Sequence, residues 1–227
     1  MSFTLDKVVP WGRSFEEYVA MFSLTPDDLK VDILGCGDGP SSFNSVLTQR
    51  SGKVISADPL FRYSKAQITQ RITDTYAEVM EQTRQNQHEF VWDSISSVEQ
   101  LGQIRMSAMQ DFLDDYEQGL VDGRYRDASL PFLPFRDGQF GLALCSHFLF
   151  LYSDQLGLEF HLEAVREMCR VAREVRIFPL LKLGAEPSGL VDSVRKDIEA
   201  EGYRVWITRV GYEFQRGGNT MMKINRG

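Results

Sequence analysis

Three glycines at alternate positions are the first residues in this 227-residue chain that indicate chemistry. Gly35, Gly37 and Gly39 follow a short apolar run at 31–34, and Pro40 comes directly after them. A strand, a glycine turn and a helix bring backbone N–H groups close to a nucleotide-like ligand in α/β proteins. Glycine serves there because it adopts positive φ and leaves room beside the backbone. A glycine-rich turn without a ligand remains the alternative.

The spacing of these glycines is G-x-G-x-G, whereas a dinucleotide-binding turn has G-x-G-x-x-G. Pro40 stands where the third glycine of that pattern would fall. This difference weighs against a site for NAD or FAD.

An acidic residue stands about 20 positions after the glycines, at the end of a second apolar run. The run 53–57 predicts a strand, and Asp58 closes it. An acid at this place can accept hydrogen bonds from the hydroxyl groups of a ribose. Capping of the turn that begins at Pro59 is the alternative role.

Ser146 and His147 follow a third apolar run, 140–145, which is typical of a buried parallel strand. Ligands bind outside the carboxyl ends of such strands. His147 is therefore a candidate general base near neutral pH. It is equally a candidate structural donor that holds a loop. The three histidines and three cysteines have no metal-ligand spacing, so we expect no metal site.

Hydrophobic periodicity predicts alternating helices and strands along the chain. We expect strands at 31–34, 53–57, about 124–132, 140–145, 174–178, 203–210 and 220–224, and helices at 15–22, 41–50, 153–172 and 191–198. Residues 61–122 form a long insertion with two amphipathic helices, the second stopped by Gly119. This insertion is expected to form a wall of a substrate pocket, or alternatively extra packing or a dimer surface.

The order of these features resembles the class I S-adenosylmethionine (SAM) methyltransferases, of the bacterial small-molecule type. The resemblance rests on the glycine turn, Asp58, Asp127 with the Leu-Pro-Phe run after it, and the strand from Phe140. It implies an α/β fold with a doubly wound, mostly parallel, seven-stranded Rossmann-like sheet. An antiparallel hairpin ends this sheet, and residues 1–227 form one domain with the helical insertion.

The resemblance also implies a cofactor, SAM, and methyl transfer to a small-molecule nucleophile. The implied cofactor-binding residues are Gly35, Gly37, Gly39, Asp58, Pro59, Leu60, Asp127, Ala128, Cys145, Ser146 and Arg13. Asp127 is placed for the adenine amino group, and Arg13 or Tyr18 for the carboxylate. A solvated arginine and a core tyrosine are the alternative roles of Arg13 and Tyr18. His147 is the catalytic candidate.

Two positions depart from the family pattern. The family has an acid two residues before the first glycine, where this chain has Ile33, and Asp32 stands one position earlier. A shift of one residue along a strand turns a side chain to the other face. Gly141 replaces the Asp that follows the opening aromatic residue of the fourth strand. A non-catalytic SAM-fold binding protein is therefore an alternative, and a nicotinamide-dependent oxidoreductase is a lesser one.

The composition narrows the class of partner. A net charge of −7 weighs against a broad nucleic-acid surface. No apolar stretch reaches the length of a membrane span. The sparse, odd set of cysteines predicts reduced thiols in a cytoplasmic protein. We expect a small-molecule substrate, no membrane and a possible homodimer.

Overall fold

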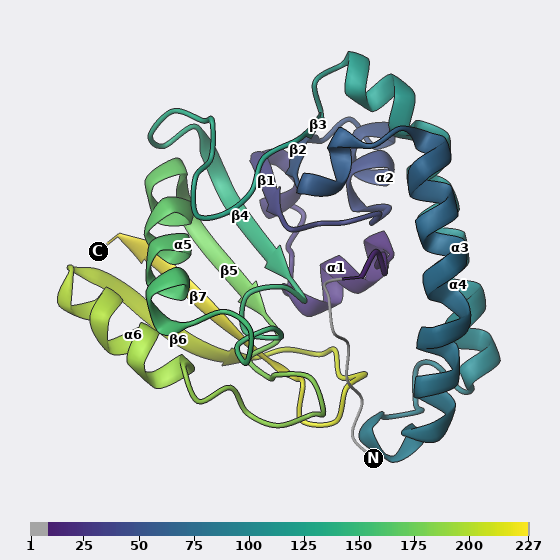
Figure 1. Cartoon of the computed structure of the whole chain (residues 1–227). Coiled ribbons are helices and arrows are strands. Elements are labelled where there is room, and N and C mark those ends of the chain that lie inside the picture. Colours follow the sequence, from purple (N-terminus) through teal and green to yellow (C-terminus); the bar gives the residue numbers. More distant parts are fainter. Residues whose placement is uncertain (1–8, 227) are drawn as a thin grey trace.

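The computed structural model describes residues 9–226, and its centre is one seven-stranded sheet (Figure 1). The strands are β1 (Asp32–Cys36), β2 (Lys53–Ala57), β3 (Tyr125–Arg126), β4 (Phe140–Ser146), β5 (Ala172–Phe178), β6 (Tyr203–Arg209) and β7 (Thr220–Arg226). Their order is β3-β2-β1-β4-β5-β7-β6. Strands β1 to β5 pair in parallel, and β7 is antiparallel to both of its neighbours. This is the class I methyltransferase fold with its antiparallel terminal hairpin, as the resemblance predicted.

Helices cover both faces of the sheet (Figure 1). They are α1 (Phe15–Met21), α2 (Phe43–Gln49), α3 (Lys65–Gln85), α4 (Val98–Val121), α5 (Leu158–Val171) and α6 (Val191–Ala200), with short 3-10 helices η1 (Asp28–Lys30), η2 (Pro59–Arg62) and η3 (Gln87–Glu89). Successive side chains of a strand point to opposite faces. Leu34 and Cys36 accordingly share a core with α5 and α6, whereas Ile33 shares one with α1 and α2. The sheet is thus doubly wound.

The two helices of the insertion lie side by side, beyond the β3 end of the sheet (Figure 1). Both begin at a serine cap, because the hydroxyl of Ser64 accepts from the N–H of Gln67 and that of Ser97 from the N–H of Gln100. Helix α4 continues past Gly119, so the predicted end at this glycine was wrong. A Cβ at Gly119 would instead collide with the ring of Tyr125. This glycine allows close packing of α4 on β3.

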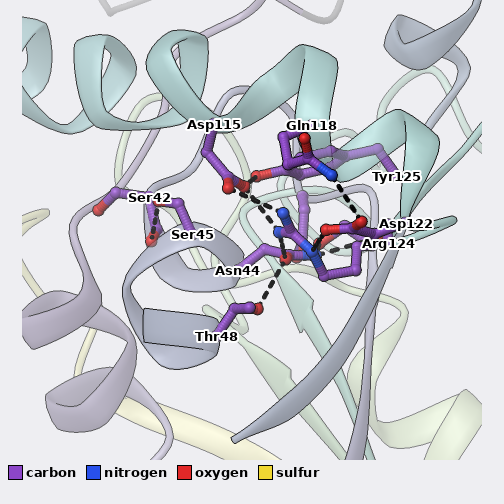
Figure 2. Close-up of polar contacts among 11 residues, drawn as sticks. Ser42, Asn44, Ser45, Thr48, Asp115, Gln118, Asp122, Arg124 and Tyr125 are labelled. Atoms are coloured by element: carbon purple, nitrogen blue, oxygen red, sulfur yellow. Dashed lines mark hydrogen bonds and ion pairs between the residues drawn. The ribbon is translucent and has the colours of Figure 1, made fainter. Parts of the chain in front are cut away.

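Arg124 connects the insertion to the sheet (Figure 2). Its guanidinium donates to both carboxylate oxygens of Asp115 on α4, at 2.7 and 2.8 Å, and to the side-chain oxygen of Asn44 on α2 at 2.8 Å. Paired bonds of this kind fix orientation as well as distance. Asn44 in turn donates to Ser56 of β2 at 3.1 Å. The insertion is thereby held to the strands that carry the candidate site.

One helix begins later than the sequence predicted. Helix α5 starts at Leu158, after turns over 149–155, and not at Ser153. The hydroxyl of Ser153 donates to the carbonyl of Phe150 at 2.8 Å and does not cap a helix. Residues 148–156 consequently form an irregular segment after β4. None of the helices within 9–226 has the length and apolarity to span a bilayer.

Candidate functional site

A cavity of about 360 Å³ lies at the carboxyl ends of the parallel strands. This is within the range of about 300–1,000 Å³ that holds small-molecule ligands. The segments that follow β1, β2, β3 and β4 all contribute to its lining, with Gly37, Asp38, Gly39, Asp58, Pro59, Leu60, Ser129, Leu130, Ser146, His147 and Phe148. The topology therefore brings together the glycine turn, the acid after β2 and the histidine after β4.

The glycine turn has the conformation that only glycine adopts at little cost. Gly37 has φ +67° and Gly39 has φ +54°. A Cβ at Gly37 would lie 3.1 Å from the ring of Phe148, whereas at Gly39 it would meet nothing within 4 Å. Gly39 thus leaves open space beside the backbone at the cavity.

Asp58 connects this turn to the end of β2. One carboxylate oxygen accepts from the N–H of Gly39 at 2.9 Å, and the other accepts from the N–H of Leu60 at 2.7 Å. Burial raises the pKa of Asp58. Each carboxylate oxygen has a second lone pair. Asp58 therefore has the capping role considered from the sequence, because it caps η2, and its carboxylate still has acceptor capacity for a ligand hydroxyl.

Asp38 is a buried acid in the glycine turn that sequence reasoning missed. Its carboxylate accepts from the hydroxyl of Tyr18 at 2.9 Å and from that of Ser56 at 2.6 Å. Burial raises its pKa to about 6. A Cβ at Gly35 would collide with this carboxylate. Gly35 is thus required by the packing of Asp38, and the one available signal was the position of Asp38 between two glycines.

A buried group of charges lies next to the turn. Arg105 of α4 is fully buried and donates to the carboxylate of Glu17 on α1, which also accepts from the hydroxyl of Tyr212 at 2.8 Å. Burial would raise the pKa of Glu17, but Arg105 and Arg13 lower it to about 2. Glu17 is therefore ionised at neutral pH.

Arg13 is the cation of this group that lines the cavity. It donates to the carbonyl of Trp11 at 2.8 Å, while its buried Nε has no hydrogen-bond partner among the described residues. Burial and the nearby Arg105 lower its pKa to about 10. Arg13 is thus a protonated, under-satisfied donor at the cavity wall, which suits the carboxylate of a ligand.

His147 lies at the end of β4 with φ +50°. Its Nδ1 is 2.9 Å from Oγ of Ser146, and its backbone N–H donates to the carbonyl of Phe178 at 2.7 Å. Burial, with the positive charges of Arg13 and Arg105, holds the pKa of His147 well below its usual range. The imidazole is therefore neutral at pH 7 and can accept a proton.

Four residues on the predicted list do not line the cavity: Gly35, Cys145, Asp127 and Ala128. Cys145 is buried within β4 opposite Cys36. Asp127 is exposed and forms an ion pair with Arg62 at 3.0 Å. The other predicted positions, including Arg13, Pro59 and Leu60, do line it.

Packing accounts for both departures from the family pattern. Asp32 lies at the start of β1, away from the cavity, with its carboxylate 3.7 Å from Lys53 Nζ. Ile33 is fully buried in the core. A Cβ at Gly141 would lie 2.7 Å from the side chain of Val31, so a larger residue does not fit there. Asp38 supplies an acid beside the turn instead.

The far wall of the cavity comes from the insertion and from the segment between β6 and β7. Residues 89–91 pair with residues 214–216 in a short antiparallel ladder that we call the closing ribbon. Val91 N–H donates to Phe214 at 2.7 Å, and Arg216 N–H donates to Glu89 at 2.8 Å. Phe90 and Phe214 both line the cavity. The insertion therefore forms a cavity wall, one of the two roles expected from the sequence.

Comparison with known proteins shows the family. The chain is 31% identical over 224 residues to the uncharacterized protein MJ0045 of Methanocaldococcus jannaschii, and the match covers 98% of each chain. The chain belongs to the MJ0045 family. No model of a known protein family matches it.

Solved structures resemble the chain in fold alone. An O-methyltransferase family protein from Burkholderia thailandensis superposes with a TM-score of 0.50 at 8% identity, covering 93% of this chain and 56% of that one. Magnesium protoporphyrin IX methyltransferase (ChlM) from Synechocystis PCC 6803, solved with bound SAM, gives a TM-score of 0.49 at 12% identity and covers 94% of this chain and 78% of its own. At these sequence identities, the solved structures do not indicate which ligand the MJ0045 family binds or which reaction it catalyses.

Proposed function

We propose that this chain is a SAM-dependent methyltransferase that acts on a small-molecule nucleophile. The glycine turn carries the proposal. Within the class I methyltransferase fold, Gly37 and Gly39 face the cavity in positive φ, and Asp58 fixes the turn through the N–H of Gly39. Backbone and acid thus converge where a nucleoside binds in open α/β sheets.

The residues at the cavity fit SAM part by part. The open space beside Gly39 accommodates the ligand next to the backbone, and Asp58 has acceptor capacity for ribose hydroxyls. Pro59 and Leu60 offer apolar contact to the adenine. The under-satisfied guanidinium of Arg13 pairs with the carboxylate. Gly35 supports this site by leaving room for Asp38, whereas Cys145, Asp127 and Ala128 lie outside the cavity lining.

Bound SAM supplies an electrophilic methyl carbon on a sulfonium sulfur that leaves as a neutral thioether. The protein aligns the acceptor and excludes water. His147 removes the proton of the acceptor. In the tautomer whose Nδ1–H donates to Ser146, Nε2 is left to accept that proton.

Neither alternative has a specific observation in its favour. Close contact with Val31 explains Gly141, and burial in the core explains Ile33. These two departures from the family pattern were the reason to consider a non-catalytic binding protein. The hypothesis of a nicotinamide-dependent oxidoreductase depends on Asp58 and the three glycines of the turn alone. We also infer a cytoplasmic chain, because Cys36, Cys145 and Cys169 are buried free thiols.

Calorimetric titration with SAM, S-adenosylhomocysteine and NAD(H) tests the proposal. We expect both adenosyl ligands to bind and NAD(H) not to bind. Gly37→Val should abolish binding, since its side chain would meet Phe148 at a strained φ. Gly157→Val is the matched control, because Gly157 lies outside the cavity lining with φ −70°. Failure of both adenosyl ligands to bind would refute the proposal.

A further inference from the structure

The part of the cavity beyond the strand ends differs in character from the part at the glycine turn. Its lining comes from α3, α4, the closing ribbon, the segments after β4 and β5, and the N-terminal segment. The apolar side chains there are those of Trp11, Val79, Leu101, Leu151, Tyr152 and Leu183, and the polar ones are those of Arg71, Thr83, Glu89 and Gln215. A ligand in this compartment is therefore held mainly by removal of apolar surface from water.

Two aromatic rings of the closing ribbon line this compartment. The rings of Phe90 and Phe214 are stacked, with centroids 5.0 Å apart and planes 26° from parallel. The ring of Trp92 packs on that of Phe214 in a T-shaped contact, with the two planes at 90°. The indole N–H of Trp92 donates to the carbonyl of Gln87 at 2.9 Å, and this bond holds the ring in place. Trp92 does not line the cavity. The two lining rings are thus held in place by a third ring that lies outside the lining.

The polar groups that could meet a reacting atom lie next to the glycine turn. His147, Ser146 and Arg13 line the cavity where β4 ends. His147 is a weak base, since burial and two arginines disfavour its protonated form. A base this weak favours an acceptor whose hydroxyl is acidic: a phenol has a pKa of about 10, whereas water has about 15.7.

We propose that the acceptor is a planar aromatic compound with a phenol-type hydroxyl, held against Phe90 and Phe214. The inference rests on the proposed methyltransferase function. The phenolic O–H gives its proton to Nε2 of His147, and an oxygen lone pair forms the bond to the methyl carbon. The carbon–sulfur bond breaks with its electron pair on sulfur. The products are an aryl methyl ether, S-adenosylhomocysteine and a proton that leaves His147 to solvent.

A pair of probes with the same carbon skeleton tests this proposal. 2-Naphthol is planar and phenolic, whereas decahydro-2-naphthol is puckered and aliphatic. Binding of each is measured by calorimetry with S-adenosylhomocysteine present, and turnover with SAM is measured separately. We expect 2-naphthol to bind and to be methylated, and decahydro-2-naphthol to bind more weakly and not to be methylated.

Phe214→Leu keeps an apolar side chain and removes the ring. It should weaken 2-naphthol binding about 2- to 13-fold, the equivalent of one aromatic pair, and leave S-adenosylhomocysteine affinity unchanged. Phe135→Leu is the control, because Phe135 packs on Phe140 outside the cavity lining. Equal binding of the two probes, or absence of binding while S-adenosylhomocysteine binds, would overturn the acceptor class and leave the methyltransferase proposal standing. Absence of S-adenosylhomocysteine binding would instead remove the proposed function.

Discussion

The carboxylate of Asp58 accepts a hydrogen bond from the backbone N–H of Gly39 at 2.9 Å. This bond joins the end of β2 to the glycine turn after β1. The same carboxylate accepts from the N–H of Leu60 at 2.7 Å. One side chain thus sets the shape of two neighbouring loops at the cavity.

Asp58→Ala should reduce both stability and cofactor affinity. Two backbone donors lose their acceptor, so we expect the free energy of unfolding to fall by about 1–3 kcal/mol. SAM affinity should fall by a similar free energy. Urea denaturation measures the first effect and calorimetry the second. Asp127→Ala is the control, since Asp127 is exposed and outside the lining; equal losses in both variants would contradict the role of Asp58.

Asp38 should make stability depend on pH. Its pKa rises from an ordinary value of 3.8 to about 6 in the folded chain, chiefly because it is buried. Between these values the folded chain holds a proton that the unfolded chain has released. The free energy of unfolding should therefore fall as pH rises from about 4 to about 6, by up to about 3 kcal/mol.

Urea denaturation of the wild type and Asp38→Asn between pH 4 and 8 measures this effect. The stability of the wild type relative to the variant should decline through this window and then level off. Glu17 affects stability at lower pH than Asp38 does, since its pKa falls from 4.5 to about 2 in the folded chain. Its contribution to the free energy of unfolding is lost as the pH falls below about 4.5. A difference that is constant from pH 4 to 8 would contradict the assignment to Asp38.

Arg105→Met should be strongly destabilising. It leaves Glu17 buried without its main counter-charge, and breaking one partner of a buried pair costs about 3–5 kcal/mol. The double variant Arg105→Met with Glu17→Gln should recover part of this loss, because the uncompensated carboxylate is gone. Chemical denaturation of the two single variants and the double variant gives the coupling energy. Strict additivity would show that the two side chains do not act as a pair.

His147→Asn should separate catalysis from binding. Asparagine tolerates the positive φ of this position better than most residues do. Loss of a general base lowers kcat about 10²- to 10⁴-fold, while SAM affinity should be unchanged. Steady-state kinetics with 2-naphthol and calorimetry with SAM measure the two effects. An unchanged kcat would contradict the role of His147 as general base and would indicate that it only holds the loop after β4.

The sequence predicted those site residues that directly follow a strand. Asp58 and His147 were identified because each directly follows an apolar run, and parallel strands bring their carboxyl ends to one edge. Asp38 was missed because its burial depends on Tyr18 and Ser56, which the chain alone does not place beside it. Phe90 and Phe214 lie far apart in the sequence and meet only through the closing ribbon. No periodicity encodes that pairing.

The closing ribbon also bears on how the chain acquires its pocket during synthesis. Residues 214–216 follow β6, whereas their partners 89–91 precede β3. A nascent chain can form the helices of the insertion before residues 214–216 leave the ribosome. Until then the aromatic wall lacks Phe214 and the ladder that holds Phe90. A ligand that needs the aromatic wall can therefore bind only after residues 214–216 have been synthesised.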